Sequence, residues 1–165
     1  MNYVIGLLVV LVVVIAQIAI MPAFNVFGVQ PNIVIVLLVG WMAVRGRKEV
    51  LVLIPIAGFA HGLLDSQPLG LAMLALAPLT LMTDIRELRL VDSPLLPAIV
   101  LTMAATVVYE STIMVTLALT GESIEWIAAV RNVLVPAAIV NALLLIPVYG
   151  LVRFASLDLR QRPAF

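Results

Sequence analysis

Hydrophobic residues fill this chain in six long blocks, which short polar joints separate. The blocks cover residues 3–21, 32–44, 50–64, 69–83, 95–119 and 126–152. The helices of a soluble protein repeat their apolar positions every 3.6 residues, whereas these blocks are apolar on all sides. The pattern therefore predicts an all-α integral membrane protein, in which residues 1–165 form a single domain: a bundle of six transmembrane helices.

The six blocks differ in length. The first, fifth and sixth reach the roughly 20 apolar residues that a spanning helix needs. The other three have 13–15 residues, which rise only about 20–23 Å. They either extend into flanking polar residues or cross a thinned or protein-shielded region. A re-entrant hairpin of the second and third blocks is the alternative, but it would place the charged joint at residues 45–49 at mid-depth, where charges are costly.

The basic residues predict the orientation of the bundle. With six crossings, eight of the nine Lys and Arg residues fall on one side: Arg45, Arg47, Lys48, Arg86, Arg89, Arg153, Arg160 and Arg162. Cytoplasmic loops carry the excess of Lys and Arg, so both termini are predicted to be cytoplasmic. No basic region precedes the first block and no cleavage site follows it, so we expect it to stay as a helix and not to act as a signal peptide.

Composition narrows the class of protein further. Apolar residues make up 64 % of the chain and charged residues 11 %, against about 45–50 % and 25 % in soluble domains. These values exclude a soluble enzyme and a nucleic-acid binder. The chain has no cysteine and one histidine, which excludes disulfides, thiolate sites and multi-histidine metal sites. No nucleophile, phosphate-loop or paired-carboxylate motif is present, so we expect neither catalytic residues nor a cofactor or metal.

The third block carries an unusual concentration of small and polar residues. Gly58, Gly62 and Ser66 recur every four residues, a spacing that lets two membrane helices approach closely. His61 and Asp65 fall beside them on the same face, because each residue turns about 100°. This face either packs against a neighbouring helix of the same chain, contacts another subunit, or lines a polar cavity.

Two charges lie inside the last two blocks. Glu110 and Arg131 are each predicted about 8–14 Å below the outer surface, at 1.5 Å per residue. Charges at that depth need partners, so we predict a structural ion pair between them; a relay carboxylate in a transporter is the alternative for Glu110. Asn132 and Asn141 are expected to donate hydrogen bonds between helices.

Three stretches of the chain resemble MreD, the family of bacterial rod-shape-determining membrane proteins. Residues 27–33 (FGVQPNI) look like the start of its second helix, and residues 41–47 like the basic end of that helix. Residues 58–70 (GFAHGLLDSQPLG) are similar to its central signature, although Gln67 stands where the family often has glycine. The third stretch, similar to the family's final helix, is RNVLVP at 131–136, followed by Asn141, Pro147 and Tyr149.

The resemblance implies a non-enzymatic subunit of the machinery that elongates the peptidoglycan cell wall. Its expected partner is MreC, a single-span protein, which would link it to the polymerase RodA, a class B penicillin-binding protein and the MreB filament. The expected location is the inner (cytoplasmic) membrane, as a multi-pass protein without nucleic-acid partners. The residues expected to support contact with the partner are Gly58, His61, Gly62, Asp65, Pro68 and Gly70.

Two other classes of function stay open. The MreD family is distantly similar to the substrate-binding components of energy-coupling-factor vitamin transporters, which implies a small-ligand-binding membrane component as the alternative. The predicted outer loops are short and offer few ligand-binding side chains, mainly Gln67, Glu122, Ser123 and Trp126. A membrane enzyme of lipid metabolism is the third class, and it lacks a supporting acidic or histidine cluster.

Overall fold

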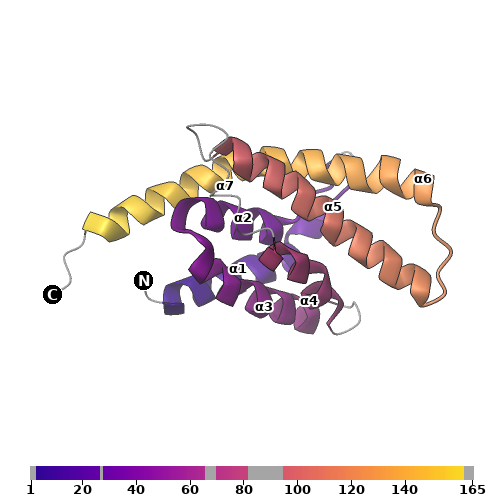
Figure 1. The fold of residues 1–165 in the computed structure, drawn as a ribbon, viewed down its shortest axis with the longest axis horizontal. Helices are drawn as coiled ribbons and strands as arrows, with labels where there is room; N and C mark the ends of the chain where they lie inside the picture. Colours follow the sequence, from indigo (N-terminus) through magenta and orange to yellow (C-terminus); the bar gives the residue numbers. More distant parts are fainter. Residues whose placement is uncertain (1–2, 27, 66–69, 82–94, 162–165) are drawn as a thin grey trace.

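A computed structural model describes residues 3–26, 28–65, 70–81 and 95–161 of the chain. Within these ranges every regular element is helical, as the sequence predicts, and no strand occurs. The elements are α1 (Tyr3–Ala19), η1 (Met21–Ala23), α2 (Ile33–Arg45), α3 (Arg47–Leu64), α4 (Leu71–Leu76), α5 (Leu95–Leu119), α6 (Trp126–Ala129), η3 (Val130–Leu134) and α7 (Val135–Gln161). Figure 1 shows α5 and α7 along one side of the bundle, α1, α3 and α4 along the other, and α2 between them.

The six predicted blocks all appear as helical segments, and the sixth is shared among α6, η3 and α7. Several boundaries differ from the prediction, and the largest difference is at α7, which continues to Gln161 where the sixth block ends at residue 152. Helix α3 begins earlier, at Arg47, and so includes residues 47–49 of the charged joint. Helix α4 ends at Leu76 and gives way to a 3-10 turn over residues 77–81. Pro78 lies in that turn and lacks the N–H that an α-helix would need there.

Three helical segments are long and apolar enough to cross a membrane: Val4–Ala23, Leu95–Leu119 and Trp126–Ser156. Helix α2 (13 residues) and the segment Leu71–Leu81 are apolar but shorter. This division into long and short helices agrees with the sequence, while the number of crossings stays a prediction. The beginning of α1 and the end of α7 lie toward the same end of the molecule in Figure 1, as an even number of crossings requires.

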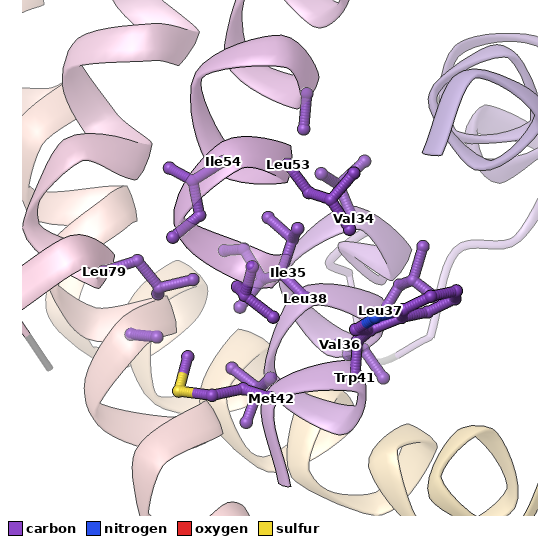
Figure 2. Packing of buried hydrophobic residues seen from close by; sticks show 14 of the residues in the cluster. Val34, Ile35, Val36, Leu37, Leu38, Trp41, Met42, Leu53, Ile54 and Leu79 are labelled. Atoms are coloured by element: carbon purple, nitrogen blue, oxygen red, sulfur yellow. The ribbon is translucent and has the colours of Figure 1, made fainter. Parts of the chain in front are cut away.

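The short helix α2 forms the centre of the hydrophobic core. Nine consecutive residues, from Val34 to Met42, are buried. Figure 2 shows Ile35 and Leu38 of α2 packed near Ile54 of α3 and Leu79. Because α2 is covered by α1, α3, α5 and α7, protein and not lipid surrounds it. Helix α2, with 13 residues, is shorter than the roughly 20 that a lipid-exposed span needs.

A cluster of polar side chains connects the end of α2, the beginning of α3 and the last part of α7. The Trp41 indole N–H donates to Glu49 Oε2 at 3.0 Å, and Arg45 lies 5.4 Å from the centre of the Trp41 ring. Arg45 also lies 3.9 Å from the Glu49 carboxylate and donates to the Ser156 hydroxyl of α7 at 3.1 Å. Ser156 in turn donates to the Val152 carbonyl. The cluster therefore ties α7 to the α2–α3 turn.

The connection between α5 and α7 projects away from the core (Figure 1). No residue from 110 to 136 is buried, although the first half of α5 contributes six residues to the buried interior. The sixth segment winds as a π-helix over Val130–Leu134, just before Pro136. Such π-bulges commonly bend helices and often mark functional sites.

Candidate functional site

The first turn of α2 is held by side chains from α1 and α7 and by its own N-cap residue, Asn32. The Asn32 N–H donates to Asn141 Oδ1 of α7 at 2.8 Å, and the Ile33 N–H donates to Gln17 Oε1 of α1 at 2.7 Å. The Ile35 N–H donates to Asn32 Oδ1 at 3.1 Å. Helix N-termini leave up to four N–H groups without helical partners. These side chains therefore replace the water that would hydrate an exposed helix start.

Asn141 connects this turn to α5 as well. Its Nδ2 donates to Thr106 Oγ1 at 3.0 Å, and the Thr106 hydroxyl donates to the Thr102 carbonyl at 2.8 Å. Asn141 is fully buried, with 0 % of its surface exposed. The predicted interhelical role of Asn141 is confirmed, because it bonds to α2 and α5 from α7. Asn132, in contrast, is exposed on η3.

A polar pocket of about 210 Å³ opens beside the α2 N-terminus. Helix α1 and the segment before α2 supply one side of it, and the end of α3 and the middle of α5 supply the other. The lining residues are Gln17, Ile18, Pro22, Gln30, Asn32, His61, Asp65, Tyr109 and Glu110. Segments that are far apart in the sequence thus place seven polar side chains around one space, which makes this pocket the candidate site.

His61 and Asp65 enter the pocket from the last turn of α3. They are four residues apart and so share a helix face, as the sequence predicts. His61 Nδ1 lies 3.8 Å from Asp65 Oδ2, which is too long for a hydrogen bond. His61 is only 8 % exposed, and its Nδ1 has no hydrogen-bond partner among the described residues. The end of α3 therefore forms a wall of the polar cavity, one of the three roles considered for this face.

Tyr109 and Glu110 enter from α5. Tyr109 is buried, whereas Glu110 is half-buried and lines the pocket. Arg131 lies on η3 and is exposed. Among the described residues, no ion pair joins Glu110 to Arg131, so the structure does not bring these two charges together. Glu110 lines the pocket together with residues of α1 and α3, and Arg131 is not among the lining residues.

Two glycines of α3, Gly58 and Gly62, lie close to other parts of the same chain. A Cβ atom on Gly58 would lie 2.6 Å from the Met73 Cα atom of α4. A Cβ atom on Gly62 would lie 3.5 Å from the backbone nitrogen of Gly70. Gly58 therefore packs against α4 of the same chain, and Gly62 lies near the residue that precedes α4. Contact of these glycines with another protein stays a proposal.

The remaining residues of the predicted partner surface have separate positions. Gly70 precedes α4 with φ of +92°, a left-handed conformation that favours glycine. Pro68 lies outside the described residues, as do Arg86 and Arg89 of the predicted basic loop. The predicted surface thus divides into an internal glycine contact and the pocket wall of His61 and Asp65.

Apart from Glu110, sequence reasoning did not identify the pocket residues of α1, of α5 and of the segment before α2. Gln17 carried the clearest signal, since it is the one polar residue within the apolar stretch 4–19. Gln30 and Asn32 stood beside Pro31 and looked like ordinary turn residues. Their common position depends on how α1, α3 and α5 surround the start of α2.

The pocket does not gather the ligands of a metal ion. Within residues 3–26, 28–65, 70–81 and 95–161, no three His, Cys, Asp or Glu side chains are placed close enough to bind one. His61, Asp65 and Glu110 line the pocket without forming such a group. The polar lining instead suits hydrogen bonding to a molecule that brings several donors.

Comparison with protein families gives a match over nearly the whole chain. The family model described as rod shape-determining protein MreD matches residues 1–155. No curated protein and no solved structure matches the chain. The matched range includes all the pocket residues and all the helices through most of α7.

Proposed function

We propose, from the premise that this chain belongs to the MreD family of rod shape-determining proteins, that it is a non-enzymatic subunit of the bacterial cell-wall elongation machinery. Membership makes it a rod-shape-determining membrane protein. The finer proposal is that it binds an MreC-like single-span protein in the inner membrane. Through this partner it acts with RodA, a class B penicillin-binding protein and the MreB filament in peptidoglycan synthesis. The family match over residues 1–155 is the observation that carries this proposal.

To bind the membrane helix of the partner, this chain needs an exposed helix face that the partner's backbone can approach closely. Association in lipid lacks a hydrophobic drive and depends on close packing and interhelical hydrogen bonds. Because α4 covers Gly58, we propose the exposed face of α7 around Gly150 instead. Leu143, Pro147, Gly150 and Phe154 are all exposed and share one helix face at spacings of four, three and four residues.

Gly150 supports this choice. A Cβ atom there would meet nothing within 4 Å among the described residues, so none of them requires glycine at this position. Glycine costs a helix about 1 kcal/mol relative to alanine. A small residue on an outward helix face favours close approach of another helix.

Replacing Gly150 with leucine is expected to reduce co-purification of an MreC-like partner about tenfold, because the added side chain holds the two helices apart. The yield of folded protein should not fall, since the new side chain points into open space. The measurement is affinity purification in mild detergent with mass spectrometry, together with cell shape. The matched control is Val12→Leu on the exposed face of α1. If only the Val12→Leu variant fails to co-purify the partner, the contact lies on α1 and not on α7.

We also propose that all six segments cross the membrane, and cysteine labelling tests this topology. The chain contains no cysteine, so single cysteines can be labelled without background. With cytoplasmic termini and six crossings, Glu122→Cys should react with an impermeant thiol reagent added to intact cells, and Lys48→Cys should react only after the cells are opened. Both native residues are exposed. Labelling of Lys48→Cys in intact cells would contradict the six-crossing proposal.

The alternative function, a small-ligand-binding membrane component, gains support from one observation. The pocket at Gln17, His61 and Glu110 is polar and lies at the ends of α1 and α3 that the proposed topology turns outward. Its volume of about 210 Å³ is below the roughly 300–1,000 Å³ of pockets for drug-sized ligands. A ligand there would be small, and ligand binding is compatible with a subunit of the elongation machinery.

A further inference from the structure

Two groups in the pocket have bonding capacity that the described residues leave unused. His61 Nδ1 is buried without a hydrogen-bond partner, although about nine in ten buried polar groups in proteins have one. Glu110 is half-buried within α5, and no cation of the described chain pairs with it. An ionisable residue inside a membrane helix is costly without a partner and commonly marks a functional site. Both groups line the same pocket.

The lining defines the charge of a suitable ligand. Asp65 and Glu110 supply two carboxylates, and no Lys or Arg stands among the described residues around the pocket. The side chains of Gln17, Gln30, Asn32 and Tyr109 are polar and uncharged. Ionised carboxylates accept hydrogen bonds and donate none, and bonds between an N–H cation and a carboxylate are about twice as strong as neutral ones. The pocket therefore favours a cation with N–H donors.

The size and ligand set of the pocket narrow the class of cation. A metal ion is disfavoured, because His61, Asp65 and Glu110 do not come together as a metal-binding group. A volume of about 210 Å³ corresponds to about seven waters at roughly 30 Å³ each. This space suits a small organic molecule, because it is below the roughly 300–1,000 Å³ of pockets for drug-sized ligands.

We propose that the pocket binds a small organic cation through an ammonium group, with Asp65 and Glu110 accepting its hydrogen bonds and His61 beside them. This site is independent of the contact with a single-span partner. The bound cation would lie between α1, α3 and α5, where these helices surround the start of α2. Because it binds only the folded protein, it would stabilise the folded bundle.

The test measures the thermal stability of the purified full-length protein in detergent during titration with ethylammonium chloride, at an ionic strength held constant with sodium chloride. We expect a saturable rise in Tm with half-saturation at about 1 mM or above, the range reachable by three non-hydrogen atoms. Tetramethylammonium has the same charge but no N–H donors, and it should give no saturable rise. Absence of a saturable ethylammonium response, or an equal response to tetramethylammonium, would overturn the proposal.

A pair of isosteric variants locates the site. Glu110→Gln removes one of the two proposed acceptor charges and should raise the half-saturating ethylammonium concentration about tenfold, equivalent to the loss of one charge-assisted bond. Glu122→Gln changes an exposed carboxylate outside the pocket and should leave that concentration unchanged. Equal responses in the two variants would contradict the assignment. The comparison of the two ammonium ions uses the unmodified chain, so it decides the proposal even if Glu110→Gln folds poorly.

Discussion

Replacing Gly58 with alanine should reduce the stability of the bundle by about 1–3 kcal/mol, the usual cost of overpacking a tight interior. The new Cβ atom would stand 2.6 Å from the Met73 Cα atom. That neighbour is backbone, so a rotamer change cannot relieve the contact, and α3 and α4 must move apart. The measurement is Tm and the yield of monodisperse protein in detergent. Gly58→Leu should lower the yield further, because a larger side chain enters the same contact.

Gly62→Ala is the matched control, one helical turn further along α3. Its Cβ atom would lie 3.5 Å from the Gly70 nitrogen, an ordinary van der Waals contact. Alanine also favours the helix by about 1 kcal/mol over glycine. Gly62→Ala should therefore be neutral or slightly stabilising. If Gly58→Ala matched it in Tm and yield, the close contact of α3 with Met73 would be refuted.

Replacing Asn141 with leucine should also have a large effect. Leucine is close to asparagine in size, but it removes the acceptor for the Asn32 N–H and the donor to Thr106. A buried N–H left without a partner costs about 1–3 kcal/mol, and here water cannot replace the lost bond because the site is fully buried. The expected result is a lower Tm and a smaller folded fraction on size-exclusion chromatography.

Asn132→Leu provides the comparison for Asn141. Asn132 has the same side chain in the same helical segment, but it is exposed on η3. Its replacement should change Tm little, as is usual for surface substitutions away from a bonded network. An equal loss in both variants would mean that the effect arises from the chemistry of the substitution and not from the α2 contact.

The sequence predicted the helices well because block length and hydrophobicity are local properties. It also recognised that α2 and α4 are short. It did not show what holds the start of α2: Gln17 and Asn141 stand 15 residues before and 109 residues after Asn32 and support the same turn. No local pattern links positions so far apart. Asn141 was identified as an interhelical donor because an amide in an apolar block has few alternatives.

The site was less predictable than the helices. His61 and Asp65 were found through their spacing on one helix face, but the glycines beside them were assigned to a partner. The turn of α3 directs Gly58 toward α4 and His61 toward the pocket, and a helical wheel does not say which neighbour covers which face. The ion pair between Glu110 and Arg131 was predicted because both residues were expected at the same depth below the outer surface. Equal depth does not determine which surroundings each side chain has: Glu110 lines the pocket, whereas Arg131 is exposed on η3.

The bonding of the α2 start has a consequence for biosynthesis. The Asn32 N–H bonds to Asn141, which the ribosome adds 109 residues later. At about 5–20 residues per second, that interval lasts roughly 5–20 seconds. During this time the newly made α2 lacks one of its partners, and an unbonded N–H is costly in lipid. Helix α2 should therefore settle in the bilayer last, after α7 has emerged, and a nascent chain that ends before Asn141 should be a substrate for membrane quality-control proteases.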